Sequence, residues 1–262
     1  MMMSEHPLDA PEIVSRLFYP RSAQRGSSTI PNTQDGVVMI DPQEAIMIGY
    51  RMYQPETPEA VILLFHGNGE VAADYDFIAG QYLSMNVIFI VADFRGYGWS
   101  SGMPLTSTLL TDAEVVAKAL PEILGERDSL PKYIMGRSLG SAPAVHLAYT
   151  FPDLFKGLIL ESGFSDMPSV LRHLQIPVDL SRVTDMPIGN AKRLESVAMP
   201  LLVIHGEADN LLPIENGEKL FAASVAENKT FLRVRGAGHN DILMRAGASY
   251  FDALKKLMNE TR

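Results

Sequence analysis

The sequence predicts an α/β fold in which a mostly parallel, doubly wound sheet is covered by helices on both faces. Strand-like apolar runs alternate with helical patterns along most of the chain, as in sheets whose strands are joined by crossover helices. Most of these runs are almost continuously apolar, which is typical of strands buried on both faces. The chain has 262 residues, 47% of them hydrophobic, so we expect a single domain, 1–262, with a large core.

The first two predicted strands form a hairpin. Residues 37–41 and 45–53 are short strand-like runs, and the turn sequence at 41–44 connects them. The second run alternates in part between apolar and polar residues. We therefore expect this pair at an edge of the sheet, with one face in solvent.

The parallel part of the sheet follows the hairpin. Its predicted strands are the apolar runs 60–67, 87–94, 132–136, 157–163, 201–206 and 230–236. Helical patterns lie between or after them at about 74–84, 106–124, 139–150, 214–225 and 241–259. Residues 164–199 interrupt the alternation, because they are mixed in polarity and contain three prolines. We interpret 164–199 as a small cap insertion over the ends of the strands rather than as a second domain.

Composition excludes several classes of function and location. The 22 basic and 31 acidic residues give a net charge of −9, so we expect no nucleic-acid partner. The absence of cysteine removes disulfides, thiolate metal sites and a cysteine nucleophile. The first residues do not resemble a secretory signal, and no apolar stretch reaches the ~20 residues of a membrane span. We expect a cytoplasmic protein without a stable membrane anchor.

A serine between two glycines marks the expected site. Gly136-Arg137-Ser138-Leu139-Gly140 stands where an apolar strand ends and an apolar helix begins. Glycine permits the strained backbone of a strand–turn–helix elbow, which presents the hydroxyl of Ser138 as a nucleophile. In sheets of this kind, functional residues gather beyond the carboxyl ends of the strands. The alternative interpretation is that the small residues only permit close packing.

A serine nucleophile needs a base and a third group that orients the base. Of the six histidines, His239 alone follows the last predicted strand, in the glycine-containing loop 236–241. Asp209 follows the preceding strand and completes the chain order serine, aspartate, histidine, so we prefer it as the acid. Two alternatives stay open: Asp209 only caps a turn, or the acid is Glu161 and, failing that, Asp166.

Acyl transfer also needs hydrogen-bond donors for the developing oxyanion. The backbone N–H of Leu139 directly follows the nucleophile, and the backbone N–H of Asn68 lies in the loop after the strand 60–67. We predict that these two groups form the oxyanion hole. The glycines beside Asn68 are equally compatible with an ordinary turn.

Five ordered motifs carry a resemblance to a known superfamily: HGNGE, DFRGYGWSSG, GRSLGSAPAV, HGEADNLLP and GAGHNDIL. From about residue 35 onward, the chain resembles the α/β-hydrolase fold superfamily. The last two motifs and Pro143 resemble its minimal-cap branch, which includes eukaryotic protein depalmitoylases and bacterial hydrolases. The depalmitoylases carry a lipidated N-terminal cysteine cluster, which this chain lacks, so a membrane-tethered role is not expected. The resemblance implies a Ser138–Asp209–His239 triad with oxyanion donors at Asn68 and Leu139.

Residues and resemblance together predict a serine hydrolase that cleaves a carboxylic ester or thioester through an acyl-enzyme. This chemistry requires neither a metal nor an organic cofactor, and its partner is a small acyl substrate. A serine peptidase or amidase and a perhydrolase are the catalytic alternatives, since they use the same triad. A non-catalytic ligand-binding or sensor protein of the same fold is the alternative from another class. No oligomeric state follows from the sequence.

The predicted substrate pocket combines the cap with the loop after the strand 87–94. Its residues are Tyr97, Trp99, Met167, Leu171 and Met186. These side chains suit an apolar acyl group. The alternative is that they only pack the cap onto the core.

Overall fold

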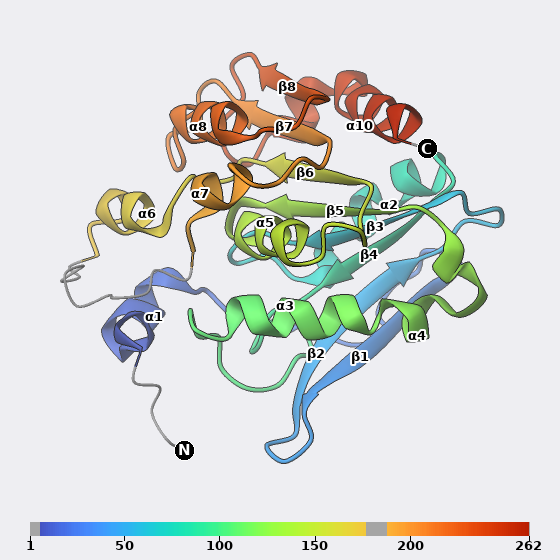
Figure 1. The fold of residues 1–262 in the computed structure, drawn as a ribbon. Coiled ribbons are helices and arrows are strands. Elements are labelled where there is room, and N and C mark those ends of the chain that lie inside the picture. Colours follow the sequence, from blue (N-terminus) through green and yellow to red (C-terminus); the bar gives the residue numbers. More distant parts are fainter. Residues whose placement is uncertain (1–5, 177–187, 262) are drawn as a thin grey trace.

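The chain folds around one eight-stranded sheet (Figure 1). The computed structural model describes residues 6–176 and 188–261. The strands are β1 (Thr33–Asp41), β2 (Ile46–Tyr53), β3 (Ala60–Phe65), β4 (Val87–Ala92), β5 (Lys132–Arg137), β6 (Gly157–Glu161), β7 (Leu201–Gly206) and β8 (Lys229–Val234). Their order across the sheet is β1-β2-β4-β3-β5-β6-β7-β8. β2 pairs antiparallel with β1 and β4, and the remaining neighbours pair parallel. The predicted edge hairpin and parallel sheet are confirmed, but only β1 exposes a face to solvent, since every residue of β2 except Met47 is buried.

Helices cover both faces of the sheet (Figure 1). They are α1 (Pro11–Leu17), α2 (Asp76–Leu83), α3 (Leu109–Lys118), α4 (Leu120–Leu124), α5 (Ser141–Thr150), α6 (Met167–His173), α7 (Asn190–Leu194), α8 (Glu215–Ala223), α9 (Ile242–Ala246) and α10 (Ala248–Glu260). α3, α5 and α8 contribute to the hydrophobic core of one face, and α2 and α10 to the core of the other. The predicted doubly wound arrangement is therefore confirmed.

Strand β3 shows how a continuously apolar sequence serves both faces. Val61, Leu63 and Phe65 belong to the core under α3 and α5, whereas Ile62 and Leu64 belong to the core under α2 and α10. All five side chains are at most 2% exposed. Because successive side chains of a strand point to opposite faces, burial on both faces requires an apolar residue at every position.

The helix predicted over 106–124 is divided in two. α3 ends at Lys118 and α4 begins at Leu120, with Pro121 in its first turn. Proline has no backbone N–H and cannot continue the hydrogen-bond ladder of a preceding helix, whereas the first turn of a new helix accepts it.

Helix α1 precedes the first strand, where the sequence analysis predicted no element. Ile13 and Leu17 are one helical turn apart, which places them on the same helix face. They are 4% and 3% exposed and belong to the same core as α3 and α5. The N-terminal segment is therefore an integral part of the domain.

The described part of the predicted cap contains two helices with different neighbours. Residues of α6 and Leu17 of α1 line one cavity at the end of the sheet. α7 packs against α5 instead, where the Asn190 amide donates to Phe164 O at 2.9 Å and to Ser141 Oγ at 3.3 Å. Residues 177–187 of the predicted cap lie outside the described residues.

Candidate active site

Strand β5 ends directly before Ser138, which lies on a tight turn. Ser138 has a φ angle of +51°, in the left-handed region that residues other than glycine rarely adopt. Ser138–Gly140 forms a short 3-10 turn, and α5 begins at Ser141. Backbone strain of this kind concentrates at functional sites, where the surrounding structure maintains it.

The two glycines of the turn allow α5 to approach the sheet closely. A Cβ atom at Gly136 would lie 2.7 Å from the Cβ of Ala144, and one at Gly140 would overlap the carbonyl group of Phe65. The backbone at Gly140 therefore lies directly against the end of β3. This contact fixes the elbow beside the loop that follows β3.

Gly140→Ala is expected to lower the free energy of unfolding by about 2–3 kcal/mol, because the new methyl group must displace backbone. Gly80→Ala in α2 is the matched control, since a Cβ there meets no atom within 4 Å. That change should stabilise the protein by about 0.5–1 kcal/mol, because alanine favours helix. Urea unfolding of both variants measures the difference. Equal stability of Gly140→Ala and wild type would contradict the close approach.

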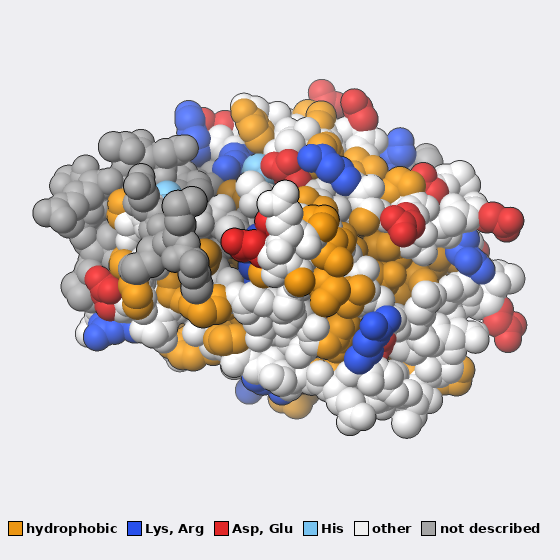
Figure 2. Space-filling view, turned by 90° about the horizontal axis from the view of Figure 1, so that it is seen from below, with side chains coloured by type: hydrophobic (Ala, Val, Ile, Leu, Met, Phe, Trp, Pro, Cys, Tyr) orange, Lys and Arg blue, Asp and Glu red, His pale blue; other side chains and the backbone are white. Residues whose placement is uncertain are grey.

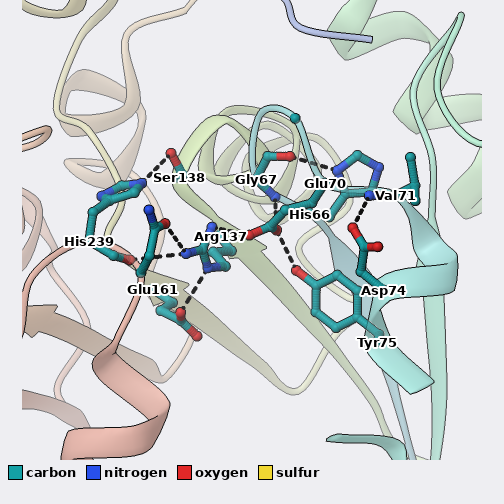
Figure 3. A network of polar contacts seen from close by, with 12 residues as sticks. His66, Gly67, Glu70, Val71, Asp74, Tyr75, Arg137, Ser138, Glu161 and His239 are labelled. Atoms are coloured by element: carbon teal, nitrogen blue, oxygen red, sulfur yellow. Dashed lines mark hydrogen bonds and ion pairs between the residues drawn. The ribbon is translucent and has the colours of Figure 1, made fainter. Parts of the chain in front are cut away.

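The structure brings Ser138, His239 and Asp209 together in one hydrogen-bonded chain. Ser138 Oγ lies 3.0 Å from His239 Nε2 (Figure 3). His239 Nδ1 lies 2.7 Å from Asp209 Oδ2. An ionised carboxylate only accepts, so Nδ1 carries the proton and donates it to Asp209. The free electron pair of Nε2 then faces the Ser138 hydroxyl, as a general base requires.

Asp209 also organises its own loop after β7. Its Oδ1 accepts the backbone N–H groups of Leu211 at 2.9 Å and Leu212 at 2.8 Å. The turn-cap role considered for Asp209 is thus real, and the other carboxylate oxygen still reaches His239. Burial raises the pKa of Asp209, but hydrogen bonds from His205, His239 and the Leu212 N–H outweigh it and hold the pKa well below its usual value. The carboxylate is therefore ionised at neutral pH.

The alternative acids contact other groups. Glu161 accepts from Arg137 Nε at 3.1 Å and from the Tyr250 hydroxyl at 2.5 Å. Asp166 caps α6 by accepting the Ser169 N–H at 2.8 Å. Among the described contacts, neither carboxylate meets the imidazole of His239.

The side chain of Asn68 binds the N-terminal segment. Its Nδ2 donates to Leu17 O at 2.7 Å, and its Oδ1 accepts from the Tyr19 N–H at 3.0 Å and from the Tyr97 hydroxyl at 2.6 Å. These bonds fix the loop after β3. No acceptor among the described residues engages the backbone N–H of Asn68 or Leu139.

A cavity of about 230 Å³ opens beside Ser138 and His239. Its lining is Leu17, Tyr19, Asn68, Arg137, Ser138, Leu139, Phe164, Met167, Val170, Leu174, Leu211, Leu212, His239 and Asn240. Most of these side chains are apolar, and no carboxylate lies among them. Tyr19 and Leu211 are 58% and 44% exposed, which places them at the mouth.

Of the predicted pocket residues, Met167 lines this cavity, and three others lie elsewhere in the structure. Trp99 lies at the edge strands instead, where its indole N–H donates to Gly36 O at 3.0 Å. Tyr97 is fully buried behind the loop of Asn68. Leu171 of α6 is buried in the hydrophobic core that also contains residues of α3 and α5, rather than on the cavity wall. Met186 lies outside the described residues.

Several wall residues were missed by the sequence analysis, among them two pairs from segments that were not considered for the pocket. Leu17 and Tyr19 come from the N-terminal segment, and Leu211 and Leu212 from the loop that holds Asp209. The helical spacing of Ile13 and Leu17 is a signal for α1. No sequence pattern indicates that α1 lies beside the nucleophile, since its packing against the loop after β3 is a tertiary contact.

The described residues contain no group of three or more His, Asp or Glu side chains placed to hold a metal ion. In the same part of the chain, no helix combines the length and apolar character needed to cross a membrane.

The fold and the residues at its strand ends define a member of the α/β-hydrolase superfamily. The chain belongs to the family whose model is described as "Serine aminopeptidase, S33", which matches residues 56–186, half of the chain. This membership makes the protein a hydrolase. The superfamily implied by the five motifs is confirmed.

Relatives and solved structures agree with this assignment. The chain is 31% identical to an uncharacterized protein of Mycobacterium tuberculosis over 94% of its own length and 87% of the other. It is 28% identical to alpha/beta hydrolase domain-containing protein 17B of Homo sapiens, over 76% of its own length and 66% of the other. The Pyrococcus furiosus esterase Pf2001 superposes with a TM-score of 0.75 at 16% identity, over 92% of this chain and 98% of the esterase. The last similarity concerns the fold.

Proposed function

We propose that the protein is a serine hydrolase that cleaves a carboxylic ester or thioester with an apolar acyl group. The observation that carries the proposal is the Ser138–His239–Asp209 hydrogen-bonded chain, placed at the end of an apolar cavity. An activated serine and a wall for an acyl group are what acyl transfer requires.

The proposed reaction has two steps. Ser138 Oγ attacks the substrate carbonyl carbon while its proton passes to His239 Nε2, and the oxyanion accepts from the backbone N–H groups of Asn68 and Leu139. Collapse expels the alcohol or thiol, which takes the proton from His239. Water then gives a proton to His239 and attacks the acyl-enzyme. The acid leaves, and Ser138 regains its proton.

The cavity lining favours an apolar acyl group. Hydrophobic side chains also gather on the surface at the end of the molecule that holds α1 and α6 (Figure 2, left).

The family description names an aminopeptidase, which makes peptide hydrolysis the second candidate. A free substrate ammonium group would call for a carboxylate, and the described lining offers none. Ester or thioester cleavage is therefore the better fit.

Steady-state hydrolysis of three substrate series tests the proposal: p-nitrophenyl esters of two to twelve carbons, matching acyl thioesters, and aminoacyl p-nitroanilides. We expect turnover of esters or thioesters, with the highest kcat/KM for acyl groups longer than acetyl. Turnover of the anilides alone would favour the peptidase. A folded protein that hydrolyses none of them would favour the binding or sensor alternative.

Val170→Phe is expected to narrow the acyl site, since Val170 on α6 lines the cavity. We expect kcat/KM for an octanoyl ester to fall about tenfold relative to that for the acetyl ester, because lost or blocked methylene contacts change binding by this order. Arg172→Phe is the matched control on the exposed side of the same helix. An unchanged octanoyl-to-acetyl ratio in Val170→Phe would place the acyl group elsewhere.

The cytoplasmic location stays a prediction. A relative in Saccharomyces cerevisiae, 27% identical, is described as an uncharacterized membrane protein. Fractionation of cells that express the full chain would decide between a free and a membrane-associated protein.

A further inference from the structure

The residue before the nucleophile lies at the centre of a polar network behind the site (Figure 3). The side chain of Arg137 is 12% exposed. Its guanidinium forms ion pairs with Glu70 and Glu161, the latter at 3.1 Å from Nε. Nη2 donates to His239 O and to Asn240 Oδ1, each at 3.0 Å. One planar group thus binds four acceptors on three separate segments of the chain.

Glu70 connects this guanidinium to the loop that carries Asn68. One carboxylate oxygen of Glu70 accepts the Gly67 N–H at 2.8 Å and the Tyr75 hydroxyl at 2.8 Å. A Cβ atom at Gly67 would lie 2.5 Å from Arg137 Nη1. The guanidinium therefore packs directly against the backbone of the loop, and only glycine at position 67 leaves room for it.

The contacts to His239 O and Asn240 reach the loop of the proposed base. The backbone carbonyl of His239 belongs to the residue whose imidazole meets Ser138 Oγ. Arg137 adjoins Ser138 in sequence, so its position is fixed by β5. The same guanidinium therefore contacts the loop after β3, through Glu70, and the loop of His239, on the two sides of the nucleophile.

The charges in the network hold it in one arrangement. Burial raises the pKa of Glu70, but the Arg137 guanidinium together with the Tyr75 hydroxyl and the Gly67 N–H holds it below its usual value. Two carboxylates thus face one permanently charged guanidinium. Charge-assisted bonds to a rigid fork have well-defined directions, which a flexible ammonium group does not reproduce.

We propose that Arg137 is a positioning residue, which fixes the Asn68 loop and the His239 loop relative to Ser138. The inference rests on the proposed function. Catalytic groups require placement to a fraction of an ångström, and a displacement of about 1 Å can cost about 100-fold in rate. Arg137 contributes to the cavity lining, but its described polar contacts reach neither Ser138 Oγ nor the His239 imidazole, so its main effect should lie in kcat.

Arg137→Lys tests the inference, because lysine keeps the charge but cannot bind both loops at once. We expect kcat per folded molecule to fall about 10- to 100-fold, with KM within about threefold of wild type. The second-order rate of fluorophosphonate labelling at Ser138 should fall in parallel, since it reports the geometry of the nucleophile without substrate binding. Folded fractions are measured by urea unfolding.

Arg51→Lys is the matched control. Arg51 lies on β2, next to the edge strand β1; it is fully buried and binds two carboxylates, Asp35 at 2.6 Å and Asp76 at 3.0 Å. Its replacement should lower the stability while leaving kcat per folded molecule unchanged. An equal loss of kcat in both variants would mean that any buried arginine supports the fold to the same extent, and would overturn the inference.

A second variant covers the case in which Arg137→Lys does not fold. Glu161→Gln keeps the shape of the network but removes one negative charge. We expect kcat to fall about three- to tenfold, because the Arg137 guanidinium should shift slightly and the two loops with it. Wild-type kcat in either folded variant overturns the role of Arg137. Wild-type protein that neither turns over esters nor labels at Ser138 refutes the proposed function itself, which is a separate outcome.

Discussion

Ser138→Ala is expected to lower kcat for an ester substrate by about 10⁶-fold while the protein stays folded. The magnitude is that of removing the nucleophile of a serine–histidine–aspartate unit. Alanine retains the backbone and the Cβ atom, and only the hydroxyl that meets His239 at 3.0 Å is lost. Little change in stability should follow. The measurement combines kcat on the preferred acyl ester, urea unfolding, and mass mapping of a fluorophosphonate label.

The label gives a readout that does not depend on finding the natural substrate. It should attach to the peptide that contains Ser138 in wild type and should be absent from Ser138→Ala. Ser165→Ala is the matched control, since Ser165 is also buried but bonds to Asp166 and Asn216 away from the imidazole. That variant should label like wild type. Residual wild-type turnover in Ser138→Ala would move the nucleophile to another residue.

Asp209→Asn is expected to lower kcat by about 10⁴-fold, the order seen when the acid of such a unit becomes an amide. The amide removes the negative charge that stabilises imidazolium and favours the wrong tautomer of His239. Stability should also fall, because hydrogen bonds hold the pKa of Asp209 well below its usual value in the folded protein, and asparagine loses the stabilisation of that buried negative charge. The kcat is therefore expressed per folded molecule.

Asp166→Asn is the control for the acid. Asp166 caps α6, and asparagine is an equally good N-cap, so both activity and stability should stay near those of wild type. A loss of only a few-fold in Asp209→Asn would contradict its role and return attention to Glu161. The contacts of Glu161 with Arg137 and Tyr250 make that outcome unexpected.

Several features of the protein follow from local sequence alone. The apolar runs predict the strands because burial on both faces leaves no position for a polar side chain, as in β3. The glycines beside Ser138 predict the elbow because the tight turn needs close backbone contact. A side chain at position 140 would overlap the carbonyl group of Phe65 at the end of β3. The chain order of Ser138, Asp209 and His239 predicts their meeting, since each follows a strand of one parallel sheet and those ends share an edge.

The substrate wall and the network of Arg137 required the tertiary structure. Trp99 and Tyr97 follow β4 and were predicted in the pocket, yet one packs at the edge strands and the other lies behind Asn68. Leu17 and Tyr19 line the wall because Asn68 binds their backbone across about fifty residues of sequence. Sequence patterns report the periodicity of an element and the strain of a turn. They do not report which side chains of distant segments meet, because those contacts depend on how the whole chain packs.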